Sequence, residues 1–136
     1  MNNPKNSKQV KHSSVSFFLG LLIFFSGCAY YNTFYNARRY FEEGEKARLE
    51  NVGESLPSSA KNAYQSVIDK SIIILNKYPQ SKYVLPAMLL IGKSRYHLGE
   101  YTQAENIFRR LGQEGRAEYQ NESQYWLALT KWKSGK

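Results

Sequence analysis

The fold of this chain is decided by the stretch Leu85–Leu111, LPAMLLIGKSRYHLGEYTQAENIFRRL. Its first half is apolar nearly all round the helical wheel, which predicts a helix buried between neighbours. Gly99 then suits the left-handed backbone conformation that closes a helix. The second half, from Tyr101 to about Gln113, places its apolar residues on one helical face. The stretch therefore predicts two helices joined by a tight turn.

Helical spacing also marks residues 32–50, 60–77 and 117–134. The clearest apolar stripe lies in the second of these segments and consists of Ala60, Ala63, Tyr64, Val67, Ile68, Ser71, Ile72 and Leu75. We expect Ser58 or Ser59 to cap this helix and the proline that follows it to end it. Since no stretch alternates with period two for long, the predicted fold class is all-α.

The helices also form a repeat. Gly92 recurs as Ala128, and Gly99 recurs as Gly135, each 36 positions later. A period in the mid-thirties with two helices per unit predicts a helical solenoid. The pattern resembles the tetratricopeptide repeat at Ile91-Gly92, Gly99-Glu100-Tyr101, Ala104 and Phe108.

This resemblance implies a right-handed solenoid of helical hairpins, with about two and a half repeats in residues 32–136. Helix pairs would span residues 32–77 and 82–113, and a single helix would span 117–134. A solenoid needs a polar cap at each end, but the last helix carries Trp132 and other apolar residues with nothing downstream to cover them. We therefore expect a chain truncated at its C-terminus. If it does end there, this face would bind a second copy or a partner.

The N-terminal region has the layout of a secretory signal. Lys5, Lys8 and Lys11 precede an apolar run, Val15–Phe25, without any acidic residue. This run is shorter than the roughly 20 apolar residues that cross a bilayer. The small residues before the only cysteine, in Ser26-Gly27-Cys28, resemble the lipobox of bacterial lipoproteins.

The lipobox resemblance implies that residues 1–27 are a signal peptide that is removed, that Cys28 is acylated, and that residues 28–31 form a tether. Two or more acyl chains anchor a protein stably. The alternative is that Val15–Tyr31 stays uncleaved as a signal anchor. In enterobacterial lipoproteins, an aspartate directly after the acylated cysteine retains the protein at the inner membrane. This chain has Ala29 at that position, which favours the periplasmic face of the outer membrane over the inner membrane.

The link Tyr78-Pro79-Gln80-Ser81-Lys82-Tyr83 resembles the connection between repeats in the BamD-like outer-membrane lipoproteins. Together with a lipobox directly before the repeats, it implies a protein-binding scaffold in outer-membrane protein assembly. A cell-wall or secretion-system adaptor built from the same parts is the alternative. The expected partners are other envelope proteins, and the membrane through acylated Cys28.

The charge pattern does not favour nucleic acid as a partner. The formal net charge is +8, and it falls to +5 once three lysines leave with the signal. The pairs Arg38-Arg39 and Arg109-Arg110 lie near glutamates on helical patterns, whereas nucleic-acid binding needs a basic stripe on one face. A single cysteine forms no internal disulfide, so packing must stabilise the domain.

No catalytic constellation stands out. His97 is the only histidine after the signal, and no nucleophile or orienting partner is evident for it. Cys28 has no Cys or His at metal-ligand spacing, and no glycine-rich phosphate loop occurs. We expect a protein that is not an enzyme and holds no metal or cofactor. An anchored hydrolase would need a catalytic part outside this chain.

Tetratricopeptide arrays bind partners on a concave surface lined by the first helix of each repeat. Carried over position by position, the resemblance places partner contacts at Leu89, Lys93, Tyr96, His97, Tyr125, Leu129, Trp132 and Lys133. Such a groove suits an extended peptide or a helix with apolar anchors and acidic groups. The alternative is that Leu89, Leu129 and Trp132 are core residues.

Aromatic residues are concentrated just after the predicted lipid site. Phe34 and Phe41 are expected to pack in the core against the second helix. The side chains of Tyr30 and Tyr31 are expected either in the core or at the headgroup level of a membrane, where tyrosine is favoured. In the second case Arg38-Arg39 would lie near anionic lipids.

Overall fold

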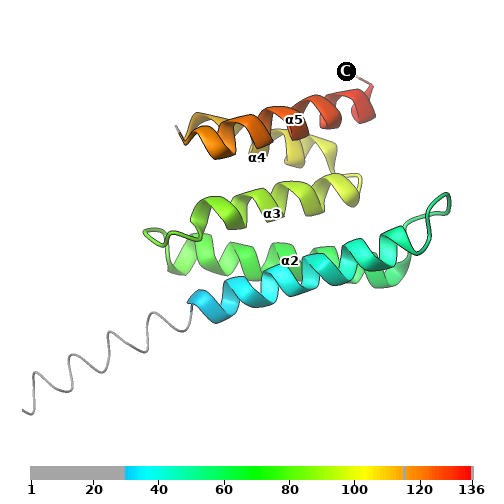
Figure 1. Ribbon diagram of the computed structural model, residues 1–136, viewed down its shortest axis with the longest axis horizontal. Helices are drawn as coiled ribbons and strands as arrows, with labels where there is room; N and C mark the ends of the chain where they lie inside the picture. Colours follow the sequence, from blue (N-terminus) through cyan, green and yellow to red (C-terminus); the bar gives the residue numbers. More distant parts are fainter. Residues whose placement is uncertain (1–29, 115, 136) are drawn as a thin grey trace, which may run out of the picture.

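The described part of the protein is a stack of five helices (Figure 1). The computed structural model describes residues 30–114 and 116–135. The first helix is described over residues 30–49, and the others are α2 (Ser58–Lys77), α3 (Val84–His97), α4 (Tyr101–Gln113) and α5 (Ala117–Ser134). No strand occurs in these residues, which confirms the all-α fold class. The predicted signal peptide, residues 1–27, and the predicted acylation site Cys28 lie outside the described residues.

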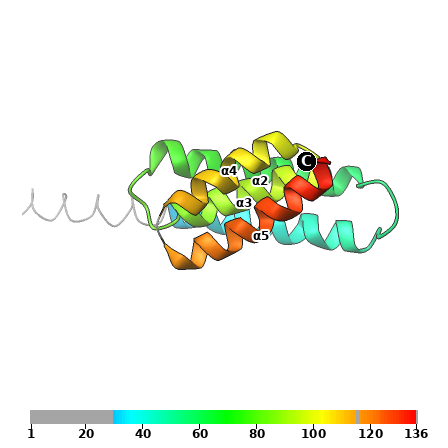
Figure 2. The ribbon, with the colours of Figure 1, turned by 90° about the horizontal axis from the view of Figure 1, so that it is seen from above.

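Successive helices run back and forth and pack in chain order (Figure 1, Figure 2). The first helix and α2 form one hairpin, α3 and α4 form the next, and α5 follows. α2 contacts α3, α3 contacts α4, α4 contacts α5, and α3 also contacts α5. This arrangement is a helical-hairpin solenoid, as predicted. None of the helices in the described ranges combines the length and the apolar character that crossing a bilayer requires.

In each hairpin, a glycine on the first helix faces an aromatic ring on the second helix. A Cβ atom built on Gly92 would lie 2.5 Å from Cε1 of Phe108, and one built on Gly44 would lie 2.9 Å from Cε1 of Tyr64. Both rings are buried. Because glycine has no side chain, the ring can lie directly on the facing helix backbone. The same packing therefore recurs in both hairpins.

Gly92→Ala is expected to destabilise the protein by about 1–2 kcal/mol, although alanine is ordinarily the better helix former by about 1 kcal/mol. The added methyl group would overlap the Phe108 ring, which is 1% exposed, so the ring or the helices must shift. Chemical denaturation followed by circular dichroism measures the change. The control, Gln103→Ala on the exposed side of α4, should stay within about 0.5 kcal/mol of the wild type. A Gly92→Ala protein more stable than the wild type would contradict this packing.

The N-terminus of α2 differs from the prediction. Ser58 and Ser59 lie inside the helix, and the N-cap is Pro57, which has an extended conformation and makes no side-chain capping bond. The prediction that a serine caps α2 is therefore wrong. The physical reason is that the Pro57 carbonyl already accepts the first helical hydrogen bond, from the Lys61 N–H at 3.0 Å. The helix thus starts directly after the proline.

Other helix ends and buried faces follow the predictions more closely. α2 ends directly before Tyr78-Pro79, and Gly99 beyond the end of α3 takes the left-handed conformation with φ of 79°. Most of the predicted α2 stripe is buried, but Ile72 is 38% exposed, whereas Ile74 is fully buried. At about 100° per residue, Ile72 lies at the edge of the sector that faces the neighbouring helices, and Ile74 lies inside it.

Candidate functional site

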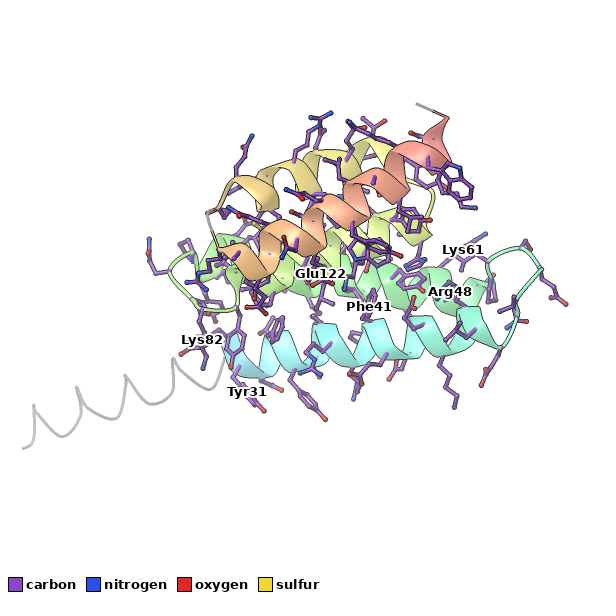
Figure 3. All side chains as sticks on the ribbon, turned by 45° about the horizontal axis from the view of Figure 1, so that its top comes forward. Tyr31, Phe41, Arg48, Lys61, Lys82 and Glu122 are labelled. Atoms are coloured by element: carbon purple, nitrogen blue, oxygen red, sulfur yellow. The ribbon has the colours of Figure 1, made fainter. Side chains whose placement is uncertain are left out.

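The first helix, α3 and α5 share one face of the stack, called the inner groove, which contains two hollows. The distal hollow, of about 420 Å³, is lined by Arg48, Tyr96, His97, Tyr101, Trp126, Leu129 and Lys133. The proximal hollow, of about 260 Å³, is lined by Phe34, Arg38, Pro86, Leu89, Leu90, Glu118, Tyr119 and Glu122. In Figure 3, Phe41, Arg48 and Glu122 lie between the first helix and α5. The groove therefore crosses both hairpins and the helix that follows them.

An ion pair lies between the two hollows and ties α5 to α3. Nζ of Lys93 in α3 lies 2.5 Å from Oε1 of Glu122 in α5, and the Lys93 side chain is only 18% exposed. The same Nζ lies 5.4 Å from the centroid of the Trp126 ring. An ammonium group above a tryptophan ring is attracted by the ring electrons. Lys93 of α3 therefore contacts both Glu122 and Trp126 of α5 and links the two helices between the hollows.

Four side chains from three helices form a polar network beside the distal hollow. The carboxylate of Glu45 accepts a short hydrogen bond from the Tyr64 hydroxyl and bonds of 3.1 and 2.7 Å from Nε and Nη2 of Arg48. Nε2 of His97 lies 3.2 Å from Oε1 of Glu45. The His97 ring also stacks on Tyr64, with centroids 5.1 Å apart. This network joins the first helix, α2 and α3.

The surroundings of these groups shift their pKa values. Burial raises the pKa of Glu45, but hydrogen bonds from Arg48 and Tyr64 and the nearby charges outweigh burial and leave the pKa lowered. Burial and the hydrogen bond to Glu45 raise the pKa of Tyr64. Burial lowers the pKa of His97 to about 4, although the charge of Glu45 acts in the opposite direction. At neutral pH the wall of the distal hollow therefore presents an uncharged imidazole.

The free energy of unfolding is expected to fall as the pH is lowered from about 6.5 to about 4. Unfolded His97 binds a proton near its ordinary pKa of 6.5, whereas the folded state binds it only near 4. The unfolded state therefore holds more protons in this window, so stability is full above it and is lost as the pH falls through it. The loss is on the order of 3 kcal/mol.

Denaturant titrations at several pH values, compared between the wild type and His97→Phe, measure this effect. Phenylalanine can keep the stacking on Tyr64 but cannot titrate. The wild type should lose stability as the pH falls from about 6.5 towards about 4, and the variant should lose much less. The same pH dependence in both proteins would show that His97 is not the group responsible.

Six of the eight predicted partner contacts lie along the inner groove. They are Leu89 in the proximal hollow, Lys93 between the hollows, and Tyr96, His97, Leu129 and Lys133 in the distal hollow. Leu89 and Leu129 are half-buried, so they reach the groove surface as well as the packing beneath it. The fold therefore brings residues of α3 and α5, which are far apart in the sequence, onto one surface.

Tyr125 and Trp132, the other two predicted partner contacts, lie outside both hollows. They are 63% and 71% exposed, respectively. At about 100° per residue, positions 125 and 132 fall to one side of the stripe formed by Trp126, Leu129 and Lys133. The two rings therefore form an exposed flank of α5 beside the groove.

The groove also contains residues that the sequence prediction missed. Trp126 forms part of its aromatic wall, because its ring stacks on Phe108 at 6.0 Å and meets Tyr96 edge-on at 5.3 Å. Phe34 and Arg48 reach the groove from the first helix. That helix matches the repeat pattern weakly, so no position could be carried over to it. Only the helical spacing of the large side chains on the first helix could have indicated Phe34 and Arg48.

The groove has the properties of a binding surface. No three His, Cys, Asp or Glu side chains gather closely enough to hold a metal ion in residues 30–114 and 116–135. His97, Glu45 and Tyr64 contact one another, and their hydrogen bonds hold three helices in place. The result is an aromatic wall beside an open hollow, which suits the docking of a side chain from another molecule.

Comparison with known proteins agrees with this geometry. Residues 86–114 match the family model described as tetratricopeptide repeat. The chain contains a tetratricopeptide repeat. The match covers the α3–α4 hairpin, and repeats of this kind generally mediate contacts between proteins. No curated protein and no solved structure matches the chain.

Proposed function

We propose that this protein is a scaffold that binds partner proteins in its inner groove while a lipid on Cys28 holds it to a membrane of the bacterial envelope. The observation that carries the proposal is the groove itself. Its two hollows are lined by the first helix, α3, α5 and Tyr101 at the start of α4, and residues 86–114 of this arrangement match the tetratricopeptide repeat. Solenoids of helical hairpins use such extended concave surfaces for binding.

The distal hollow fits a partner segment that combines an apolar side chain with an acidic group. Tyr96, Trp126 and Leu129 supply apolar walls, and Lys133 is exposed at the rim. A large side chain buried in a pocket of this kind commonly dominates binding energy. A carboxylate beside it would form a charge-assisted hydrogen bond with the Lys133 ammonium group.

Photocrosslinking in cells tests the groove. A photoreactive phenylalanine analogue placed at position 96 or 133 is expected to capture partner proteins, whereas the analogue at position 103, on the exposed side of α4, is the matched control. Capture at all three positions alike, or only at position 103, would show that partners bind elsewhere. Mass spectrometry of the captured proteins identifies them.

The lipid tether is tested separately. Radioactive fatty acid is expected to label the wild type and not Cys28→Ser, because Cys28 is the only thiol in the chain. If the wild type takes no label and stays in the membrane at full length, residues Val15–Tyr31 act as an uncleaved anchor and the acylation proposal fails.

We further propose a role in outer-membrane protein assembly of the BamD kind. Two features support this role. The link Tyr78–Tyr83 resembles the connection between repeats in the BamD-like lipoproteins, and the alanine after Cys28 favours the outer membrane. Density-gradient fractionation should place the protein with outer membranes, and the crosslinked partners should be assembly components. Cell-wall or secretion components among the captured proteins would instead favour an adaptor role.

A further inference from the structure

One end of the stack carries five clustered tyrosines, called the tyrosine end. Tyr30, Tyr31 and Tyr35 come from the first helix, and Tyr78 and Tyr83 come from the link between α2 and α3. The Tyr83 ring lies 5.7 Å from Tyr30 and 6.3 Å from Tyr31, and the Tyr30 ring lies 5.7 Å from Tyr78. Tyr31 and Tyr35 are each 55% exposed. The fold thus joins two distant segments in one aromatic surface.

The tyrosine end is also basic. Lys77 and Lys82 line a shallow hollow of about 560 Å³ there, and Nζ of Lys82 lies 5.3 Å from the centroid of the Tyr83 ring. Residues 30–41 and 70–99 contain no aspartate or glutamate. In Figure 3, Tyr31 and Lys82 lie at the same end, far from Arg48 and Lys61. Positive charge and exposed phenol rings are therefore combined on one surface.

The sequence before the described residues indicates what covers this surface. Cys28 lies two residues before Tyr30, and the apolar run Val15–Phe25 ends five residues before it. Two residues span at most about 7 Å. A lipid on Cys28 would therefore hold Tyr30 close to the headgroups, and an uncleaved Val15–Tyr31 segment would do the same.

We propose that the tyrosine end docks on the surface of a lipid bilayer. Its phenol rings lie at headgroup level, where an amphipathic ring can place its body in the apolar boundary and its hydroxyl in water. Lys77 and Lys82 lie against anionic lipid phosphates. This docking rests on the membrane tether proposed above, and it adds a second contact that fixes the orientation of the stack.

Docking in this way positions the inner groove relative to the membrane. The first helix leads away from the tyrosine end, and Arg48 follows Tyr30 by 18 residues. At 1.5 Å per residue, Arg48 stands about 27 Å from that end. The distal hollow is therefore presented to partners well above the bilayer, while the proximal hollow, whose lining includes Phe34, Arg38, Glu118 and Glu122, lies nearer the headgroups.

Spin labelling of the acylated full-length protein in vesicles of phosphatidylethanolamine and phosphatidylglycerol tests the docking. Acylation consumes the thiol of Cys28, so Tyr35→Cys or Lys82→Cys each leaves one site for a nitroxide. We expect both nitroxides to be several-fold less accessible to a water-soluble nickel chelate than the nitroxide of the control, Glu54→Cys. Glu54 is exposed in the loop at the opposite end of the first helix.

A charge reversal tests the proposed contact between the lysines and anionic lipid phosphates. With the nitroxide at position 35, the additional change Lys82→Glu is expected to increase nickel access in the anionic vesicles, because like charges then repel. The same change should have little effect in vesicles of phosphatidylcholine alone. An equal effect in both vesicles would overturn the assignment of the lysines to anionic lipid.

The outcomes separate the docking from the tether. Equal nickel access at positions 35, 82 and 54, in protein that stays with the vesicles, would overturn the docking and leave the tether standing. Protein that leaves the vesicles, or that also takes a label on Cys28, would overturn the tether and the docking together. Protection found in native membranes but absent from protein-free vesicles would show that a partner protein covers the tyrosine end, which also overturns the docking.

Discussion

Phe108→Ala is expected to lower the free energy of unfolding by about 3–5 kcal/mol. The ring is 1% exposed and lies where three helices meet, against Gly92 of α3 and stacked at 6.0 Å on Trp126 of α5. Truncation removes the buried ring and leaves a cavity that the surrounding helices fill only in part. Chemical denaturation followed by circular dichroism measures the loss.

Two control variants make this result specific. Phe108→Leu keeps most of the buried volume and should lose less stability than the alanine variant. Gln103→Ala on the exposed side of α4 should change stability by no more than about 0.5 kcal/mol. Because Trp126 also lines the distal hollow, Phe108→Ala should weaken partner capture at position 133. A loss below about 1 kcal/mol would contradict the role of this ring in joining the helices.

Glu45→Ala is expected to lower the free energy of unfolding by about 2–4 kcal/mol. The substitution leaves the buried Tyr64 hydroxyl without its acceptor, removes the ion pair of Arg48 and takes away the carboxylate beside His97. Buried polar groups without partners carry the full cost of their lost hydration. Thermal or denaturant unfolding at neutral pH measures the change.

The matched control is Glu43→Ala on the same helix. Glu43 pairs with Arg39 at 3.4 Å, but both side chains are more than half exposed, so the expected change is about 0.5 kcal/mol or less. A double-mutant cycle of Glu45→Ala with Tyr64→Phe should show strong coupling, since either change removes the same hydrogen bond. Equal losses for the Glu45 and Glu43 variants would show that the network contributes little.

The second hairpin was the part most fully predictable from the sequence. α4 runs from Tyr101 to Gln113, the bounds expected from its apolar stripe and from Gly99 before it. The buried face, with Ala104, Phe108 and Leu111, was also predicted. These features follow from local rules, since a period of 3.6 residues and a left-handed glycine are readable in a short stretch of chain.

The candidate site was predictable only in part. The repeat pattern located Tyr96 and His97 on α3 and Leu129 on α5, because equivalent positions in a solenoid face the same way. It could not show that Arg48 of the first helix completes the distal hollow. It also could not separate the groove stripe of α5 from the neighbouring Trp132, because both carry large apolar residues and the pattern alone does not show where the groove face ends.

By itself, the sequence determined that the chain is all-α, where its second hairpin begins and ends, and that its helices stack as repeats. Only the tertiary structure decided which distant side chains meet. It brings Glu45 to Tyr64 and His97, and it joins the link at Tyr83 to Tyr30. Such contacts depend on the angle and depth at which each helix packs on its neighbours, and these are set by the interlocking of side chains over the whole stack rather than by any local pattern.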